Sequence, residues 1–249
     1  MVVNMKRNKT LEALNQDELI GKKQRLAFHE AGHAAGVHLN NKSRNLPPVF
    51  FKIIVKETGN VSETDVMTYQ AAYDDCIARV EGGRLIKLLP PAIDKLAQEL
   101  MAHQGAMALW LSSYMAAFDA DIVNLLIGPL AEAKYVAEAD DELFNDKLIN
   151  LNALSNYGGH SDIILVNEYL QSFSADKQKK DEKLAELFDT AFDFINKEEN
   201  WAAITELADY ITHSKAGIIY YEEVLSTLEQ AVLCFQDGSD KIHHGNIGH

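Results

Sequence analysis

Cysteine is nearly absent from this sequence. Its 249 residues include only two, Cys76 and Cys234, which lie far apart and form no CxxC pair. This scarcity excludes a disulfide framework and a cysteine-rich zinc module, and it is typical of proteins from reducing compartments. The N-terminal region has no apolar stretch typical of a signal peptide, and no run of about 18 apolar residues predicts a transmembrane helix. We therefore expect a cytoplasmic protein.

Basic side chains are also in the minority. Lys and Arg together number 23 against 37 Asp and Glu, which gives a formal net charge of −14. Because affinity for nucleic acid depends mainly on Lys and Arg that neutralise phosphates, this balance disfavours nucleic acid as a general partner, and we expect none. The sequence contains no GxxxxGK(S/T) phosphate loop, so we expect no ATP site of that type.

The pattern of apolar residues predicts a mainly helical α+β fold, in which a helical bundle surrounds a small β-element. Residues 25–39 are rich in Ala and Leu and predict a buried helix, and the β-branched and aromatic residues 49–55 predict a strand. The other predicted helices cover 65–80, two segments within 92–118, 119–139 with an interruption near Gly128 and Pro129, 162–173, and three segments between 184 and 235.

A single domain is expected over residues 25–235, preceded by a polar lead-in (1–24) and followed by a flexible tail (236–249). A helical insertion is predicted at about 84–118. Within it, the segment 105–118 is apolar but too short to span a bilayer. Because apolar side chains exceed what one helix face needs for packing, we expect this segment to lie in a subunit or partner interface.

One motif has the composition of a metal site. His29, Glu30 and His33 form an HExxH sequence within the predicted helix 25–39. Residues four apart lie on one face of a helix, so both imidazoles can bind one metal ion, while Glu30 projects about 100° around the helix and can hold a metal-bound water. Nitrogen and oxygen ligands with one open position favour zinc. A buried Glu between two His without a compensating cation would be costly, which supports a metal.

The third protein ligand is left open by the residues themselves. His38 follows His33 by five residues, so it points about 140° away on a continuing helix, which argues against it. Glu132 on a later helix, Asp162 near the start of the next one, and His160 beside Asp162 all have suitable ligand chemistry. Chemistry alone does not choose between a ligand role for Asp162 and a simple preference of an acid for a helix N-terminus.

Three short segments resemble the zinc peptidase domain of the FtsH-type ATP-dependent proteases. They are HEAGHA (29–34), GPLAEA (128–133) and GGHSDI (158–163), and the later IIYYEEVLSTLE resembles that family's closing helices. The likeness extends over roughly 25–235. It implies one Zn²⁺ per chain held by His29, His33 and Asp162, with Glu30 as catalytic base. Glu132 then lies outside the ligand set.

The resemblance concerns the peptidase part alone, because the family's ATPase module and membrane anchor have no counterpart in the sequence. It implies a metalloendopeptidase that hydrolyses unfolded or flexible polypeptide segments, with Glu30 as general base towards a zinc-activated water. We expect the strand 49–55 to take the peptide as an additional strand. Residues 81–84 are similar to the Gly-Gly-Arg motif of the family, but no Ala-Glu follows them. We therefore assign these residues no role.

Two other functions stay open. The chain could be a non-catalytic metal-binding scaffold or adaptor, although a structural zinc site needs no general base and usually has four protein ligands. It could also be a peptidase subunit that serves a separate ATPase. The expected partners are a polypeptide substrate and either further copies of the chain or that ATPase.

Overall fold

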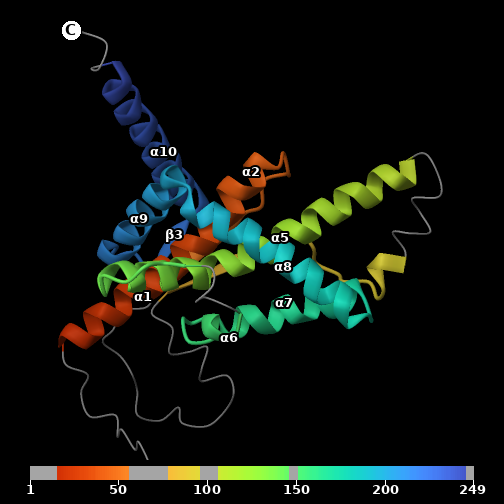
Figure 1. Ribbon diagram of the computed structural model, residues 1–249. Helices are drawn as coiled ribbons and strands as arrows, with labels where there is room; N and C mark the ends of the chain where they lie inside the picture. Colours follow the sequence, from red (N-terminus) through yellow and green to blue (C-terminus); the bar gives the residue numbers. More distant parts are fainter. Residues whose placement is uncertain (1–15, 56–77, 96–105, 146–150, 245–249) are drawn as a thin grey trace, which may run out of the picture.

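The computed structural model describes residues 16–55, 78–95, 106–145 and 151–244. Helices make up 72% of it, and the three described strands form one small antiparallel sheet (Figure 1). This confirms the predicted class, a mainly helical fold with a small β-element. The buried apolar side chains of helices and sheet form one core.

Helix α1 (Gln16–Ala35) carries the HExxH motif and begins well before the predicted start at residue 25. It continues into the π-helical turn η1 (Gly36–Asn40) and the short α2 (Asn41–Ser43). Helix α1 packs against α5 (Ala106–Ala139) and α9 (Glu198–His213). Its approach to α5 is close, because a Cβ atom at Gly32 would lie only 2.8 Å from the Ile127 carbonyl oxygen. Glycine at this position therefore allows the HExxH segment of α1 to pack closely against α5.

Helix α5 runs without a break over Ala106–Ala139, with Pro129 inside it. The predicted division at 118 and the predicted interruption near Gly128 and Pro129 are therefore wrong. Proline removes one backbone hydrogen bond, but the segment around it is fully buried in the core, where packing outweighs this local cost. The stretch Ala108–Ala139 has the length and hydropathy of a membrane span, and 72% of its most apolar window is buried in the protein.

The sheet has the strand order β2-β1-β3. Strand β1 (Phe51–Val55) confirms the predicted strand and turns alternate residues into the core. Strand β2 (Ala78–Gly82) corrects the end of the predicted helix 65–80, whose earlier residues lie outside the described part of the chain. Strand β3 (Ile218–Tyr220) was missed, because three residues give no periodicity and the sequence there continues directly into a helical pattern.

The C-terminal part is helical, as predicted. It consists of α6 (Leu151–Leu154), α7 (His160–Phe173), α8 (Lys177–Asn196), α9 (Glu198–His213) and α10 (Tyr221–His244). Helices α7 and α8 pack against α5, and α10 packs against α9. Helix α10 extends through residues 236–244 of the predicted tail, and its end extends away from the other helices (Figure 1).

Candidate metal centre

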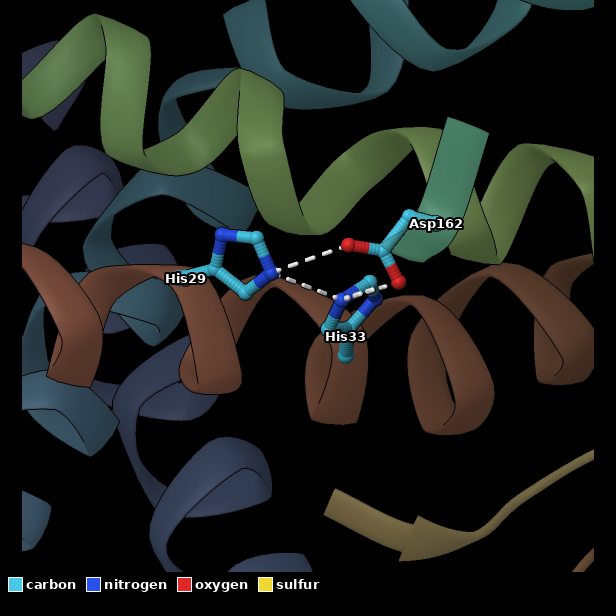
Figure 2. A group of neighbouring side chains, drawn as sticks. All are labelled: His29, His33 and Asp162. Atoms are coloured by element: carbon cyan, nitrogen blue, oxygen red, sulfur yellow. Dashed lines mark hydrogen bonds and ion pairs between the residues drawn. The ribbon is translucent and has the colours of Figure 1, made fainter. Parts of the chain in front are cut away.

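The two motif histidines of α1 face Asp162 in the first turn of α7 (Figure 2). The Nε2 atom of His29 lies 3.2 Å from Asp162 Oδ2, and the Nε2 atom of His33 lies 3.3 Å from Asp162 Oδ1. The two Nε2 atoms are 3.1 Å apart. Helices α1 and α7 are distant in the sequence, so only their common packing against α5 brings these groups together.

The separation of the two Nε2 atoms fits a tetrahedral zinc site. Ligand bonds of about 2.0–2.1 Å at tetrahedral angles place neighbouring ligand atoms about 3.3 Å apart. The two Nε2 atoms are 3.1 Å apart, which is close to this value, and each of them faces a different oxygen of Asp162, at 3.2 and 3.3 Å. Of the described residues, His29, His33 and Asp162 form the group whose ligand atoms lie within 4.8 Å of one another and can hold a metal ion.

Backbone carbonyl oxygens determine which ring nitrogen of each imidazole carries a proton. The Nδ1 atom of His29 lies 3.2 Å from the Tyr157 carbonyl oxygen and 3.2 Å from Glu132 Oε2. The Nδ1 atom of His33 lies 2.9 Å from the Asn124 carbonyl oxygen. A carbonyl oxygen can only accept a hydrogen bond, so Nδ1 carries the proton in both rings. Both Nε2 atoms then face the carboxylate, and an imidazole whose Nδ1 donates to a carbonyl binds a metal through Nε2.

A cation would compensate the charge of this cluster. His29 and Asp162 are buried, and Asp162 Oδ2 receives no hydrogen bond although it is shielded from solvent. Burial alone would lower the pKa of His29, but the contacts with Asp162 and Glu132 outweigh it and hold this pKa well above its usual range. For Asp162, burial opposes ionisation, yet the two imidazoles hold its pKa far below its usual range. The residues present therefore fit a divalent metal ion.

Glu30 lies beside this group and points to strand β2. It is buried, and its carboxylate Oε2 accepts a hydrogen bond from the backbone N–H of Val80. Burial raises the pKa of the Glu30 carboxyl, while the charges of His29 and His33 lower it in part. A buried carboxylate of raised pKa next to a metal site is a candidate general base.

The other proposed ligands lie elsewhere. His38 contacts Glu229 of α10, with Nε2 3.3 Å from Oε1. His160 is exposed at the first position of α7. Glu132 touches His29 through Nδ1, on the side of the ring that faces away from Asp162. Of the alternatives that the sequence left open, the structure therefore joins only Asp162 to the two Nε2 atoms.

Gly158 allows the turn before α7 to pass close to His29 and Glu132. Gly158 has φ +69°, and a Cβ there would lie 2.8 Å from Glu132 Oε2 and 3.1 Å from His29 Nδ1. Any other residue would be strained in this conformation and would also crowd the imidazole.

Three supporting groups were missed from the sequence. The Tyr157 carbonyl and the Val80 amide are backbone groups, and their residue types carry no sign of the role. Asn124 did offer a sign, because it is a polar residue in an apolar helix. Its side chain accepts from Asn40 at 2.8 Å and donates to Asn41 Oδ1 at 3.0 Å, which fixes α5 to the turn after α1.

Comparisons with known proteins gave no relative. No protein-family model matches the chain, and neither a curated protein nor a solved structure does. The resemblance to the FtsH-type peptidases therefore stays a prediction that rests on the three short segments and on the residues they contain.

Proposed function

We propose that this chain is a zinc-dependent endopeptidase. The observation that carries the proposal is the convergence of His29 Nε2, His33 Nε2 and the Asp162 carboxylate, whose ligand atoms lie within 4.8 Å of one another, with the buried Glu30 beside them. His29, His33 and Asp162 would hold the metal, which leaves the fourth position for water or substrate. Structural zinc sites usually fill all four positions with protein ligands, so a site of three favours catalysis.

Each group of the proposed site has a separate role in hydrolysis. When bound, zinc supplies Lewis acidity that polarises the scissile carbonyl and lowers the pKa of an attacking water towards about 7. Glu30 takes the proton of that water and later gives it to the leaving amine. The Tyr157 and Asn124 carbonyls hold the two imidazoles with Nε2 towards the metal position. The fold thus keeps each ring in a single tautomer.

The extended substrate would pair with β2. The earlier expectation that strand 49–55 takes the peptide is wrong, because β1 is the central strand and pairs with β2 on one side and β3 on the other. Strand β2 lies at the edge of the sheet, and within the described ranges no strand pairs with its outer side. Its Val80 amide reaches Glu30. A peptide added to this edge would therefore pass beside the proposed metal position.

Cleavage assays with matched variants test this function. Zinc-loaded protein should hydrolyse unfolded polypeptides, chelators should abolish the activity, and added zinc should restore it. Glu30→Gln should keep the zinc and lower hydrolysis by about 10²–10⁴-fold. Glu186→Gln is the control, because Glu186 is an exposed residue of α8 in an ion pair with Lys183 and should leave hydrolysis intact.

The result also separates the alternatives. A scaffold or adaptor would retain zinc without hydrolysing any peptide. A subunit that depends on a separate ATPase would cleave short peptides but leave folded proteins untouched until that partner is added. Hydrolysis that persists unchanged in Glu30→Gln would contradict the proposed role of Glu30.

A further inference from the structure

The backbone N–H of Val80 points outwards from the edge of the sheet. Val55 N–H donates to the Gly217 carbonyl at 2.9 Å, so it points towards β3. Antiparallel partners alternate between hydrogen-bonded and non-hydrogen-bonded pairs. Ile53 lies two residues from Val55, so its N–H also points towards β3. The partners of Val55 and Ile53 on β2 are Ala78 and Val80, so neither of these pairs exchanges hydrogen bonds across β1 and β2. The N–H groups of Ala78 and Val80 therefore project from the outer edge of β2.

At this outer edge, the Val80 N–H is already used. It donates to Glu30 Oε2, a carboxylate from helix α1. A peptide strand paired with β2 needs the same N–H for one of its own carbonyl oxygens. One donor then faces two acceptors, the Glu30 carboxylate and the substrate carbonyl. A backbone N–H makes one strong hydrogen bond, so the two cannot both be satisfied well.

We propose that the Val80 N–H holds the Glu30 carboxylate in the resting protein and passes to a peptide carbonyl when substrate pairs with β2, which frees Glu30 to accept its proton. The proposal rests on the proposed peptidase function and adds to it how the site responds to substrate. The exchange moves only hydrogen bonds. Val80 is a positioning residue here, since it acts through Glu30.

This exchange predicts that turnover depends on peptide length. A blocked dipeptide that spans only the scissile bond cannot pair with β2, whereas a blocked octapeptide with the same central residues can. A hydrogen bond to a charged group is worth enough to change a rate roughly ten- to hundred-fold. The native protein should therefore show a kcat for the octapeptide that exceeds the dipeptide value by about this factor.

Removing the N–H should abolish the difference in kcat. In Val80→Pro the donor is lost, while the β1–β2 ladder keeps its hydrogen bonds because this N–H faces outwards. The dipeptide kcat should rise towards the octapeptide value, and the octapeptide KM should rise because one pairing bond is lost. If the Val80 N–H instead held Glu30 in its productive position, Val80→Pro would lower kcat equally for both lengths, and the proposal would be wrong.

Ala78→Pro is the matched control. It also removes an outward N–H from β2, but no hydrogen bond joins Ala78 to Glu30 among the described contacts. It should raise the octapeptide KM and keep the ratio of the two kcat values. A loss of that ratio in Ala78→Pro as well would assign the effect to strand pairing in general and overturn the role of Val80.

A spectroscopic test needs neither activity nor a change at Val80. The amide signal of Val80 is followed by NMR in the full chain treated with chelator, with oxidised insulin B chain as the peptide. Glu30→Gln should shift this signal in the free protein, and it should shift it little once the peptide is bound. An equal shift in both states, or no effect of the peptide on Val80, would contradict the exchange.

The two tests also distinguish this proposal from the proposed function. Hydrolysis without length dependence would leave the peptidase function standing and remove the exchange. Exchange at Val80 without hydrolysis of any peptide would remove the peptidase function and leave the hydrogen-bond exchange standing. The protein would then bind a peptide at the edge of β2 without cleaving it.

Discussion

The imidazole of His33 packs directly against Gly128 on the facing helix α5, so that a Cβ atom at position 128 would overlap the ring at Cε1 and Nε2. The Nε2 atom is the proposed metal ligand. Glycine inside a helix costs roughly 0.5–1 kcal/mol relative to alanine. The site therefore uses a residue that is unfavourable for the helix, because only glycine leaves room for the ligand.

Gly128→Ala should displace His33 and lower zinc affinity at least about ten-fold, the lower end of what misoriented ligands cost. The measurement is zinc affinity by competition with a chelating dye. Gly21→Ala on α1 is the control, because a Cβ there meets no other atom within 4 Å. It should keep zinc affinity and stabilise the protein by roughly 0.5–1 kcal/mol. Equal zinc affinity in Gly128→Ala and the native chain would refute the ligand position of His33.

Removal of the third ligand should empty the site. We expect one zinc per native chain, and Asp162→Ala should lose most of it because two imidazoles alone bind weakly. Glu132→Ala should keep one zinc per chain at saturating metal, since Glu132 contacts only the Nδ1 side of His29. Metal analysis after gel filtration gives both values. If Glu132→Ala is empty and Asp162→Ala is full, the ligand assignment is wrong.

His38, which is partly buried outside the metal centre, should make stability depend on pH. Burial lowers the pKa of His38, against the opposing effect of Glu229 and together with that of Lys42. A histidine with a lowered pKa in the folded state binds fewer protons than it does unfolded, so the free energy of unfolding falls as pH decreases below about 6.5. In His38→Gln this part of the decrease should disappear. Urea unfolding between pH 5 and 7.5 tests it, and identical slopes for both proteins would contradict it.

The apolar segment 105–118 should mediate self-association. Leu109 and Trp110 on α5 are 72% and 52% exposed, while Leu111 is buried. The segment contains no charged residue in a chain of net charge −14, so two copies can meet there without burying charge or bringing acidic groups together. Light scattering should show a dimer or larger oligomer, and the double variant Leu109→Asp with Trp110→Asp should be monomeric.

Leu143→Asp is the control for this surface, because Leu143 is exposed but follows the opposite end of α5. It should leave the oligomer intact. A native protein that is monomeric at all concentrations would refute the interface.

The sequence by itself determined the helical class and most of the candidate site. The i, i+4 spacing of His29 and His33 places both rings on one helix face whatever surrounds it. The long amphipathic patterns after residue 184 likewise predicted helices that the structure contains. These features are local, so periodicity alone is sufficient to find them.

Only the tertiary structure shows that Asp162, and not Glu132 or His160, lies against both Nε2 atoms, because this depends on how α1 and α7 pack on α5. Strand β2 and its Val80 amide also required the fold. A strand forms only with a partner strand, and a backbone N–H looks the same in every residue but proline. Contacts between segments distant in the chain leave no local pattern, and these contacts join Glu30 to Val80.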